Sequence, residues 1–129
     1  MEKYKTINGS NLAYLGDAYY ELQIRTYLIE KGITKSNELR KYANNYVSAH
    51  AHAKICKHIY NLLTIEEVEI FKRGRNNFSK AHRKNMNLGE YAVSSGIEAV
   101  IGYLYLKKDF ERLDFLIKKM IEAAEVQEW

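Results

Sequence analysis

The chain has 129 residues, which suits one domain spanning residues 1–129, and its 47% hydrophobic content is enough for a core. The absence of proline, the seven glycines and the single cysteine argue against a disordered chain, a turn-rich all-β fold and an internal disulfide. The formal net charge is only +4, and no signal peptide or membrane-spanning run is present, so we expect a cytoplasmic protein without a membrane partner.

Helical periodicity begins in residues 11–31. Apolar residues recur there on roughly one face of a helix, which we expect to be buried: Leu12, Leu15, Tyr19, Leu22, Tyr27 and Leu28. Ser10 or Asn11 is available as the N-cap, and Gly32 follows the last turn as a stop signal. This pattern predicts a long first helix.

The following residues predict further helices and no strand. One helix begins near Ser36 and runs to residue 49, and another covers residues 50–63, with a continuous helix as the alternative. Thr64 and Glu67 have capping-box spacing ahead of a helix over residues 65–74. Asn87 can cap a helix over residues 89–108, and Asp109 one over residues 110–126. We therefore predict a single all-α domain, a helical bundle.

Positive charge is concentrated in one segment, residues 72–84, with the sequence KRGRNNFSKAHRK. It holds six Lys or Arg residues and no acid, whereas the rest of the chain has 14 Lys or Arg against 16 Asp or Glu. Local positive charge of this kind is typical of a surface that binds a polyphosphate. A solvated charged loop is the alternative interpretation.

Two acids stand in otherwise apolar segments, Asp17 in residues 12–21 and Glu98 in residues 95–106. A carboxylate in a helix core is costly unless it is paired or binds a cation, and neither acid has Lys or Arg one turn away. Gly16 also suggests close approach by a ligand or another backbone. Carboxylates suit Mg²⁺, so these acids are candidate metal ligands; buried acids bonded to tyrosine or lysine are the alternative.

The remaining candidate ligands are weaker. His50 and His52 lie two residues apart, so they point in different directions on a helix, and no cysteine or acid cluster joins them. We expect both to be partly exposed helix histidines rather than metal ligands.

The two acidic segments resemble the ribonuclease III catalytic domain. YLGDAYYE, with Asp17, is similar to the family signature E-F-L-G-D-A, and GIEAVIGYLYL, with Glu98, is similar to its second acidic helix. NELRKYANNYVSA and KRGR match the intervening segments, so the resemblance extends from about residue 10 to 108. The chain departs from the pattern at Ala13 and Ser95, where the family has acids.

The resemblance implies a homodimeric endonuclease domain that cuts double-stranded RNA with Mg²⁺ held by Asp17 and Glu98. We expect no separate RNA-binding domain after residue 129, and on this expectation the chain is similar to the Mini-ribonuclease III group of bacteria. That group is implied to trim the precursor of the large-subunit (23S) ribosomal RNA, and a large-subunit ribosomal protein is left open as a further partner.

On this interpretation the basic segment supplies affinity for the RNA duplex through phosphate and sugar contacts. The residues expected to bind RNA are Arg73, Arg75, Asn76, Asn77, Lys80, Arg83 and Lys84. Glu21 lies one turn after Asp17 and is a candidate to support it, although a structural role ranks first. Two other functions stay open: a non-catalytic RNA-binding or ribosome-associated module with this fold, and a helical protein-interaction domain.

Overall fold

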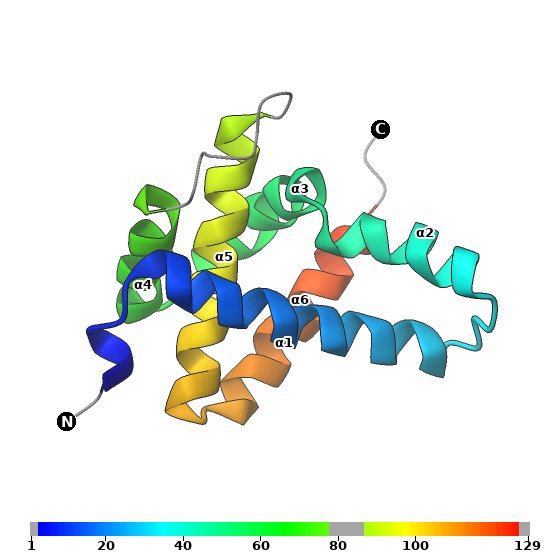
Figure 1. Cartoon of the computed structure of the whole chain (residues 1–129), viewed down its shortest axis with the longest axis horizontal. Coiled ribbons are helices and arrows are strands. Elements are labelled where there is room, and N and C mark those ends of the chain that lie inside the picture. The colour runs from blue at the N-terminus through cyan, green and yellow to red at the C-terminus, as the bar shows by residue number, and fades with distance from the viewer. Residues whose placement is uncertain (1–2, 78–86, 127–129) are drawn as a thin grey trace.

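The computed structural model describes residues 3–77 and 87–126, and these are helical without any strand (Figure 1). The prediction of an all-α fold is confirmed. In chain order the elements are the 3₁₀ turn η1 (Lys3–Lys5), α1 (Gly9–Glu30), α2 (Ser36–Val47), α3 (Ala49–Ile59), the 3₁₀ turn η2 (Tyr60–Leu62), α4 (Ile65–Asn76), α5 (Leu88–Lys107) and α6 (Phe110–Glu125). Within these ranges no helix is both long and apolar enough to cross a membrane.

Side-chain caps set several helix boundaries. The capping box at Thr64 is confirmed, because its hydroxyl accepts the Glu67 amide proton at 3.1 Å and the Glu67 carboxylate accepts the Thr64 amide proton at 3.0 Å. Asn87 and Asp109 cap α5 and α6 as predicted. Ser48 separates α2 from α3, so the continuous helix is wrong: its extended backbone breaks the helix and its hydroxyl accepts the Ala51 amide proton.

The start and the buried face of α1 differ from the prediction. The N-cap is Asn8, whose side chain accepts the Asn11 amide proton at 2.8 Å, rather than Ser10 or Asn11. The buried positions follow a four-residue spacing, whereas Leu22, expected in the core, is 58% exposed. Those positions are Leu12, Gly16, Tyr20, Ile24 and Leu28; Gly9 and Ala13, near the start of the helix, are buried as well. Leu12 and Leu28 are buried as predicted, but the prediction was wrong for Leu22, because α1 is apolar on several sides and the small residue Gly16 marks the face that packs.

α5 runs through the centre of the molecule, and α1 crosses over it (Figure 1). α4 and α3 pack against other sides of α5, and α6 lies against α3 and α5. The shared core is built largely from aliphatic side chains of α1, α3, α5 and α6. Because α5 is covered on several sides, nearly all residues from Gly96 to Leu104 are buried, as expected for a stretch with so few polar residues.

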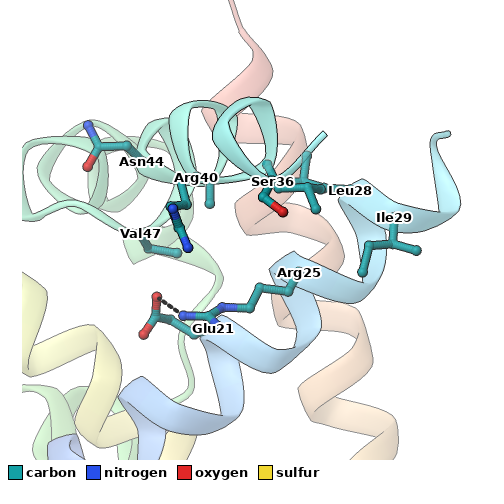
Figure 2. Close-up of a pocket in the computed structure, with 10 residues that line it drawn as sticks. Glu21, Arg25, Leu28, Ile29, Ser36, Arg40, Asn44 and Val47 are labelled. Carbon is teal, nitrogen blue, oxygen red and sulfur yellow. Dashed lines mark ion pairs between the residues drawn. The ribbon is translucent and has the colours of Figure 1, made fainter. Parts of the chain in front are cut away.

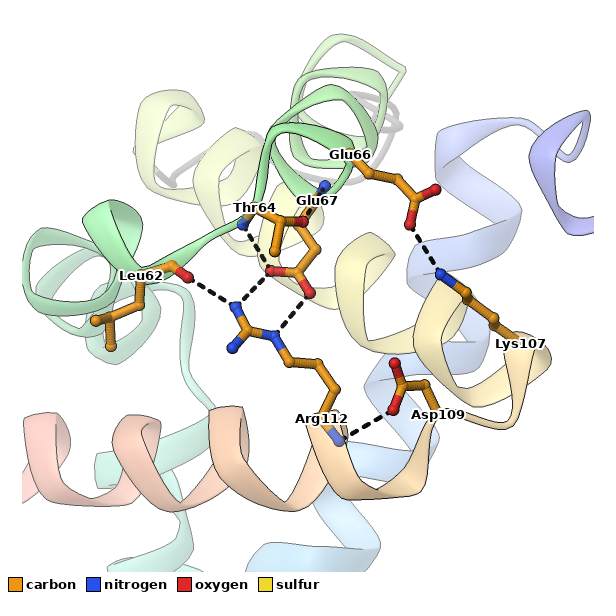
Figure 3. A network of polar contacts seen from close by, with 7 residues as sticks. All are labelled: Leu62, Thr64, Glu66, Glu67, Lys107, Asp109 and Arg112. Carbon is orange, nitrogen blue, oxygen red and sulfur yellow. Dashed lines mark hydrogen bonds and ion pairs between the residues drawn. The ribbon is translucent and has the colours of Figure 1, made fainter.

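A buried ion pair joins α4 to α6 (Figure 3). Glu67 is only 2% exposed, and its carboxylate accepts hydrogen bonds from Nε and Nη2 of Arg112 at 2.9 and 2.8 Å. Arg112 Nη2 also donates to the Leu62 carbonyl at 2.7 Å. The hydrogen bonds to Glu67 raise the pKa of the Arg112 guanidinium. This fork of donors holds α6 against the start of α4.

We expect Arg112→Lys to lower the free energy of unfolding by about 1–3 kcal/mol, because one ammonium cannot reproduce three donor contacts to two acceptor groups. Urea denaturation would measure the loss. Lys107→Arg is the matched control: Lys107 pairs with Glu66 at 3.0 Å at a more exposed site, and we expect a change within about 0.5 kcal/mol. Equal losses of unfolding free energy for the two substitutions would contradict a special stabilising role of the Arg112 contacts.

Candidate active site

Two glycines allow α1 and α5 to touch through their backbones. A Cβ added to Gly16 would lie 1.7 Å from the carbonyl oxygen of Glu98, and one added to Gly102 would lie 2.0 Å from that of Leu12. No side chain fits at either point. The close approach expected at Gly16 is therefore confirmed, and the partner is the backbone of α5. The crossing places Glu98 against the residue that precedes Asp17.

Asp17 is exposed, and Glu98 is only partly buried. The expectation of an acid in the helix core is wrong for Asp17, because α1 turns Gly16 toward α5 and Asp17 away from it. Asp17 makes no hydrogen bond or ion pair within residues 3–77 and 87–126, so a structural pairing with tyrosine or lysine does not explain it there. The exposed Asp17 carboxylate is available to a ligand from solvent, and it belongs to the turn of α1 that contacts the backbone of Glu98.

Tyr20 lies close to Glu98. Its hydroxyl is buried and donates to the Tyr46 carbonyl at 2.9 Å. Burial raises the pKa of Tyr20 most, and the Tyr46 hydroxyl and the charge of Glu98 raise it further. Tyr20 therefore stays protonated, and it lies near Glu98 in the core.

Glu21 faces a different feature, a cavity of about 400 Å³ between α1 and α2. Its carboxylate pairs with Arg25 at 3.5 Å, one turn further along α1 (Figure 2). Arg40 and Asn44 of α2 line the same cavity over an apolar floor. The structure thus gives Glu21 a partner other than Asp17, which favours the structural role.

The basic segment begins at the end of α4, beside Glu98. A Cβ added to Gly74 would lie 2.7 Å from the Ser95 carbonyl oxygen and 2.6 Å from the Ala99 Cβ, so α4 packs against the turn of α5 that carries Glu98. Arg73, expected to bind RNA, already donates from Nη1 to the carbonyls of Lys5 and Ile7 at 2.8 and 3.2 Å.

The other predicted RNA contacts fall into two groups. Arg75 is half-buried, with Nε 3.4 Å from the Asn76 Oδ1 atom and its guanidinium 6.0 Å from the centre of the Phe71 ring. Asn76 and Asn77 are exposed at the end of α4. Lys80, Arg83 and Lys84 lie outside the described residues. The described part of the segment therefore offers polar groups close to the α5 turn that carries Glu98.

His52 is the polar residue near the site that sequence reasoning missed. It was expected to be partly exposed, but it is 0% exposed, and its Nδ1 atom lies 2.7 Å from the Ser94 hydroxyl. Burial lowers its pKa to about 4, an effect that the Tyr46 carbonyl only partly opposes. His50 is exposed as expected and pairs with Glu90 at 2.9 Å. The alternation of alanine and histidine in residues 49–53 left the buried face of α3 undecided.

Burial of His52 makes stability depend on pH. The unfolded chain binds the proton near the ordinary pKa of 6.5, whereas the folded chain binds it only near 4. Between these values the unfolded state holds more protons, so stability falls as the pH is lowered. We expect this group to cost about 2 kcal/mol at pH 5 relative to pH 7. Urea denaturation at both pH values should show a smaller loss of unfolding free energy for His52→Gln than for the unaltered chain. An identical loss would contradict the role of His52 in the pH dependence.

The acids fit a hard divalent cation better than a soft one. Among the described residues no three His, Cys, Asp or Glu side chains gather into one metal-binding group, so protein ligation there would come from a pair. Asp17 and Glu98 supply carboxylate oxygens, and Mg²⁺ is commonly held by one or two carboxylates together with water and substrate phosphate. The donor set thus suits Mg²⁺ bound together with a phosphodiester.

Comparison with known proteins bears on the same region. The family model described as the Ribonuclease III domain matches residues 10–109. The chain is 44% identical to the Mini-ribonuclease 3 of Enterococcus faecalis over 126 residues, covering 96% of both chains. It is 45% identical to the Mini-ribonuclease 3 of Streptococcus pneumoniae over 121 residues, covering 92% of this chain and 94% of that one. The family match contains both Asp17 and Glu98.

A solved structure has the same fold. The crystal structure of a Fusobacterium nucleatum protein superposes with a TM-score of 0.83 at 34% sequence identity. The superposition covers 95% of this chain and 98% of the other. The arrangement of α1 to α6 is thus shared with a related protein over nearly its whole length.

Proposed function

This chain belongs to the ribonuclease III family and is an endoribonuclease, and from that premise we propose that it cuts double-stranded RNA with Mg²⁺ held by Asp17 and Glu98. The observation that carries the proposal is the contact between Gly16 and the Glu98 carbonyl, which brings the two acid-bearing turns together at the surface. Relatives at 44 and 45% identity are named as ribonucleases.

Each acid has a distinct setting for this chemistry. Exposed Asp17 meets the phosphodiester from solvent, and Glu98, held against α1, limits where a shared cation can sit. Bound Mg²⁺ would supply activation of water and neutralise charge developing on the phosphate. The water oxygen bonds to phosphorus as the bond to the 3′ oxygen breaks; the water loses a proton and the 3′ oxygen gains one. The products carry a 5′-phosphate and a 3′-hydroxyl.

We place the RNA duplex across the start of the basic segment. Arg75, Asn76 and Asn77 stand at the end of α4, which packs beside Glu98, and phosphate and 2′-hydroxyl contacts are the ones a duplex offers there. Lys80, Arg83 and Lys84 extend the same charge along the sequence. Arg73 contributes mainly by tying α4 to the chain before α1.

The substrate we propose is the precursor of the large-subunit (23S) ribosomal RNA, with a large-subunit ribosomal protein as a candidate helper that presents the site. The names of the bacterial relatives support this choice only at the level of the enzyme class. In a bacterium such an enzyme would act in the cytoplasm. Residues 1–129 would act as one catalytic domain.

We also propose that the working enzyme is a homodimer that pairs through α1. Large apolar side chains stay exposed along the helix that carries Asp17: Tyr14 is 84% exposed, Leu22 58% and Ile29 59%. An exposed apolar face of this kind is typical of an interface. Pairing two such helices would place two acid pairs on one surface, one for each RNA strand. A solution mass of two 15.1 kDa chains would agree with this arrangement.

We expect the purified chain to cut a labelled ribosomal-precursor duplex in Mg²⁺, and EDTA to abolish the cutting. Gel electrophoresis of the products would measure both rates, and a single-stranded RNA of the same sequence serves as the control. Ligation of the products to a 3′-hydroxyl acceptor would identify the 5′-phosphate. Tight binding without any cutting would favour the non-catalytic RNA-binding module, because the chain lacks the acids that the family has at positions 13 and 95.

A further inference from the structure

Apart from tyrosines, the buried polar side chains of the described core are His52, Glu67 and Ser94. Glu67 is accounted for by Arg112 and the helix cap. The other two bond to each other, since His52 Nδ1 lies 2.7 Å from the Ser94 hydroxyl. The second ring nitrogen, Nε2, is buried without a hydrogen bond of good geometry to any described residue. A pair of this kind in an apolar core calls for a reason beyond packing.

His52 stands between the two helices that carry the proposed active-site acids. Ser94 is one turn before Glu98 on α5. Tyr20, on α1, follows Asp17 by three residues, and its ring meets the His52 ring edge-on with centroids 5.2 Å apart. A single imidazole from α3 therefore touches one neighbour of each acid.

The glycine crossing explains why such a contact is needed. At Gly16 and Gly102 the two backbones meet without side chains between them, so the crossing holds the helices close but has no interlocking side chains at that point to resist their rotation. A second contact away from the crossing removes that freedom. The His52 ring, fixed to Ser94 by a hydrogen bond and to Tyr20 by ring packing, is such a contact.

Packing alone would favour a different residue. Burying a polar ring costs free energy that an apolar side chain of similar volume would not, and the buried Nε2 adds to that cost. The lowered pKa keeps the ring neutral near pH 7, and the contact with the Ser94 hydroxyl is a directional hydrogen bond. Directional contacts fix geometry more strictly than apolar packing does.

We propose that His52 is a positioning residue, which through Ser94 and Tyr20 holds α1 and α5 in the orientation that lets Asp17 and Glu98 share one Mg²⁺ ion. This inference rests on the proposed function and deepens it. Groups that orient metal ligands from behind typically change metal affinity or activity by about 10- to 100-fold when they are removed.

The test compares His52→Leu, Ser94→Ala and the conservative His52→Gln. We expect the first two to lower kcat by about 10- to 100-fold and to weaken Mn²⁺ binding, followed by electron paramagnetic resonance, by a similar factor. Affinity for the RNA duplex in EDTA should stay unchanged. His52→Gln keeps a neutral donor and acceptor near Ser94, and we expect it to retain most of the kcat.

Ile59→Val is the matched control, because Ile59 is also buried on α3 but is not part of this contact. It should lower Tm without changing kcat or Mn²⁺ affinity at a temperature where the protein is folded. The proposal is overturned if Ser94→Ala and a folded His52→Leu keep full kcat and Mn²⁺ affinity; if His52→Leu does not fold, Ser94→Ala alone decides. Failure of the unaltered chain to cut RNA would overturn the proposed function. Full activity of the two variants beside an active unaltered chain would overturn only the positioning role of His52, so the two failures are distinguishable.

Discussion

Asp17→Asn and Glu98→Gln should each slow the cleavage of duplex RNA by about 10³-fold, as expected when a metal-assisted step loses several kcal/mol of stabilisation. Both substitutions keep the size of the side chain and remove only the negative charge that binds a cation. Asp17 is exposed and Glu98 partly so, which means that neither change should unfold the protein. Single-turnover cleavage under saturating RNA would measure the effect.

Asp114→Asn is the matched control for this pair. Asp114 is an exposed acid on α6, outside the α1–α5 crossing, so the cleavage rate should stay within about twofold. RNA affinity in EDTA should be unchanged or slightly higher in the two active-site variants, since a negative charge next to the phosphates is lost. Cleavage at the normal rate by either variant would remove that residue from the site.

Gly16→Ala should both destabilise the fold and disable the site. The new Cβ would overlap the Glu98 carbonyl oxygen, 1.7 Å away, and that oxygen belongs to the backbone of α5, which cannot yield as the end of a flexible side chain could. Relief requires α1 and α5 to separate, so we expect the free energy of unfolding to fall by about 3 kcal/mol or more. The separation also displaces Asp17 relative to Glu98, and cleavage by the folded fraction should fall by about 10²-fold.

The same substitution at Gly89 provides the comparison. Gly89 lies in the first turn of α5, and among residues 3–77 and 87–126 an added Cβ would meet only the Asn87 side chain, at 3.2 Å. Alanine is the better helix former by about 1 kcal/mol, so Gly89→Ala should be neutral or mildly stabilising. Thermal and urea denaturation would compare the two variants. Equal stability of both would show that α1 and α5 are not locked at Gly16.

Helix boundaries were largely predictable from the sequence because capping is local. The Thr64 capping box, the Asn87 cap and the Asp109 cap each involve residues three apart, and the structure has all three. The start of α1 was harder to predict from the sequence, since Asn8, Ser10 and Asn11 are all good caps. Only the packing of Gly9 against the Arg73 carbonyl, at 2.3 Å from an added Cβ, distinguishes the turn that forms.

For the candidate site too, the sequence predicted what depends on local motifs and did not predict what depends on packing. The acids stood out because each lies in an apolar segment, and the motif around each is short and contiguous. Their exposure was not predictable, because the face that α1 buries depends on where α5 passes. The sequence also led to the wrong burial for His52, since alanine on both sides gives no apolar contrast between the faces of α3.

By itself the sequence determined the helical class, most caps and the two acids, which depend on residues within a few turns of one another. It also determined the resemblance to ribonuclease III, because each motif that carries it is short and contiguous. The tertiary structure decided which face of α1 is buried, that Asp17 faces solvent, that Arg73 bonds to the chain before α1, and that His52 lies between the acid-bearing helices. These facts depend on contacts between residues far apart in the chain, where burial is set by the partner helix rather than by local preference.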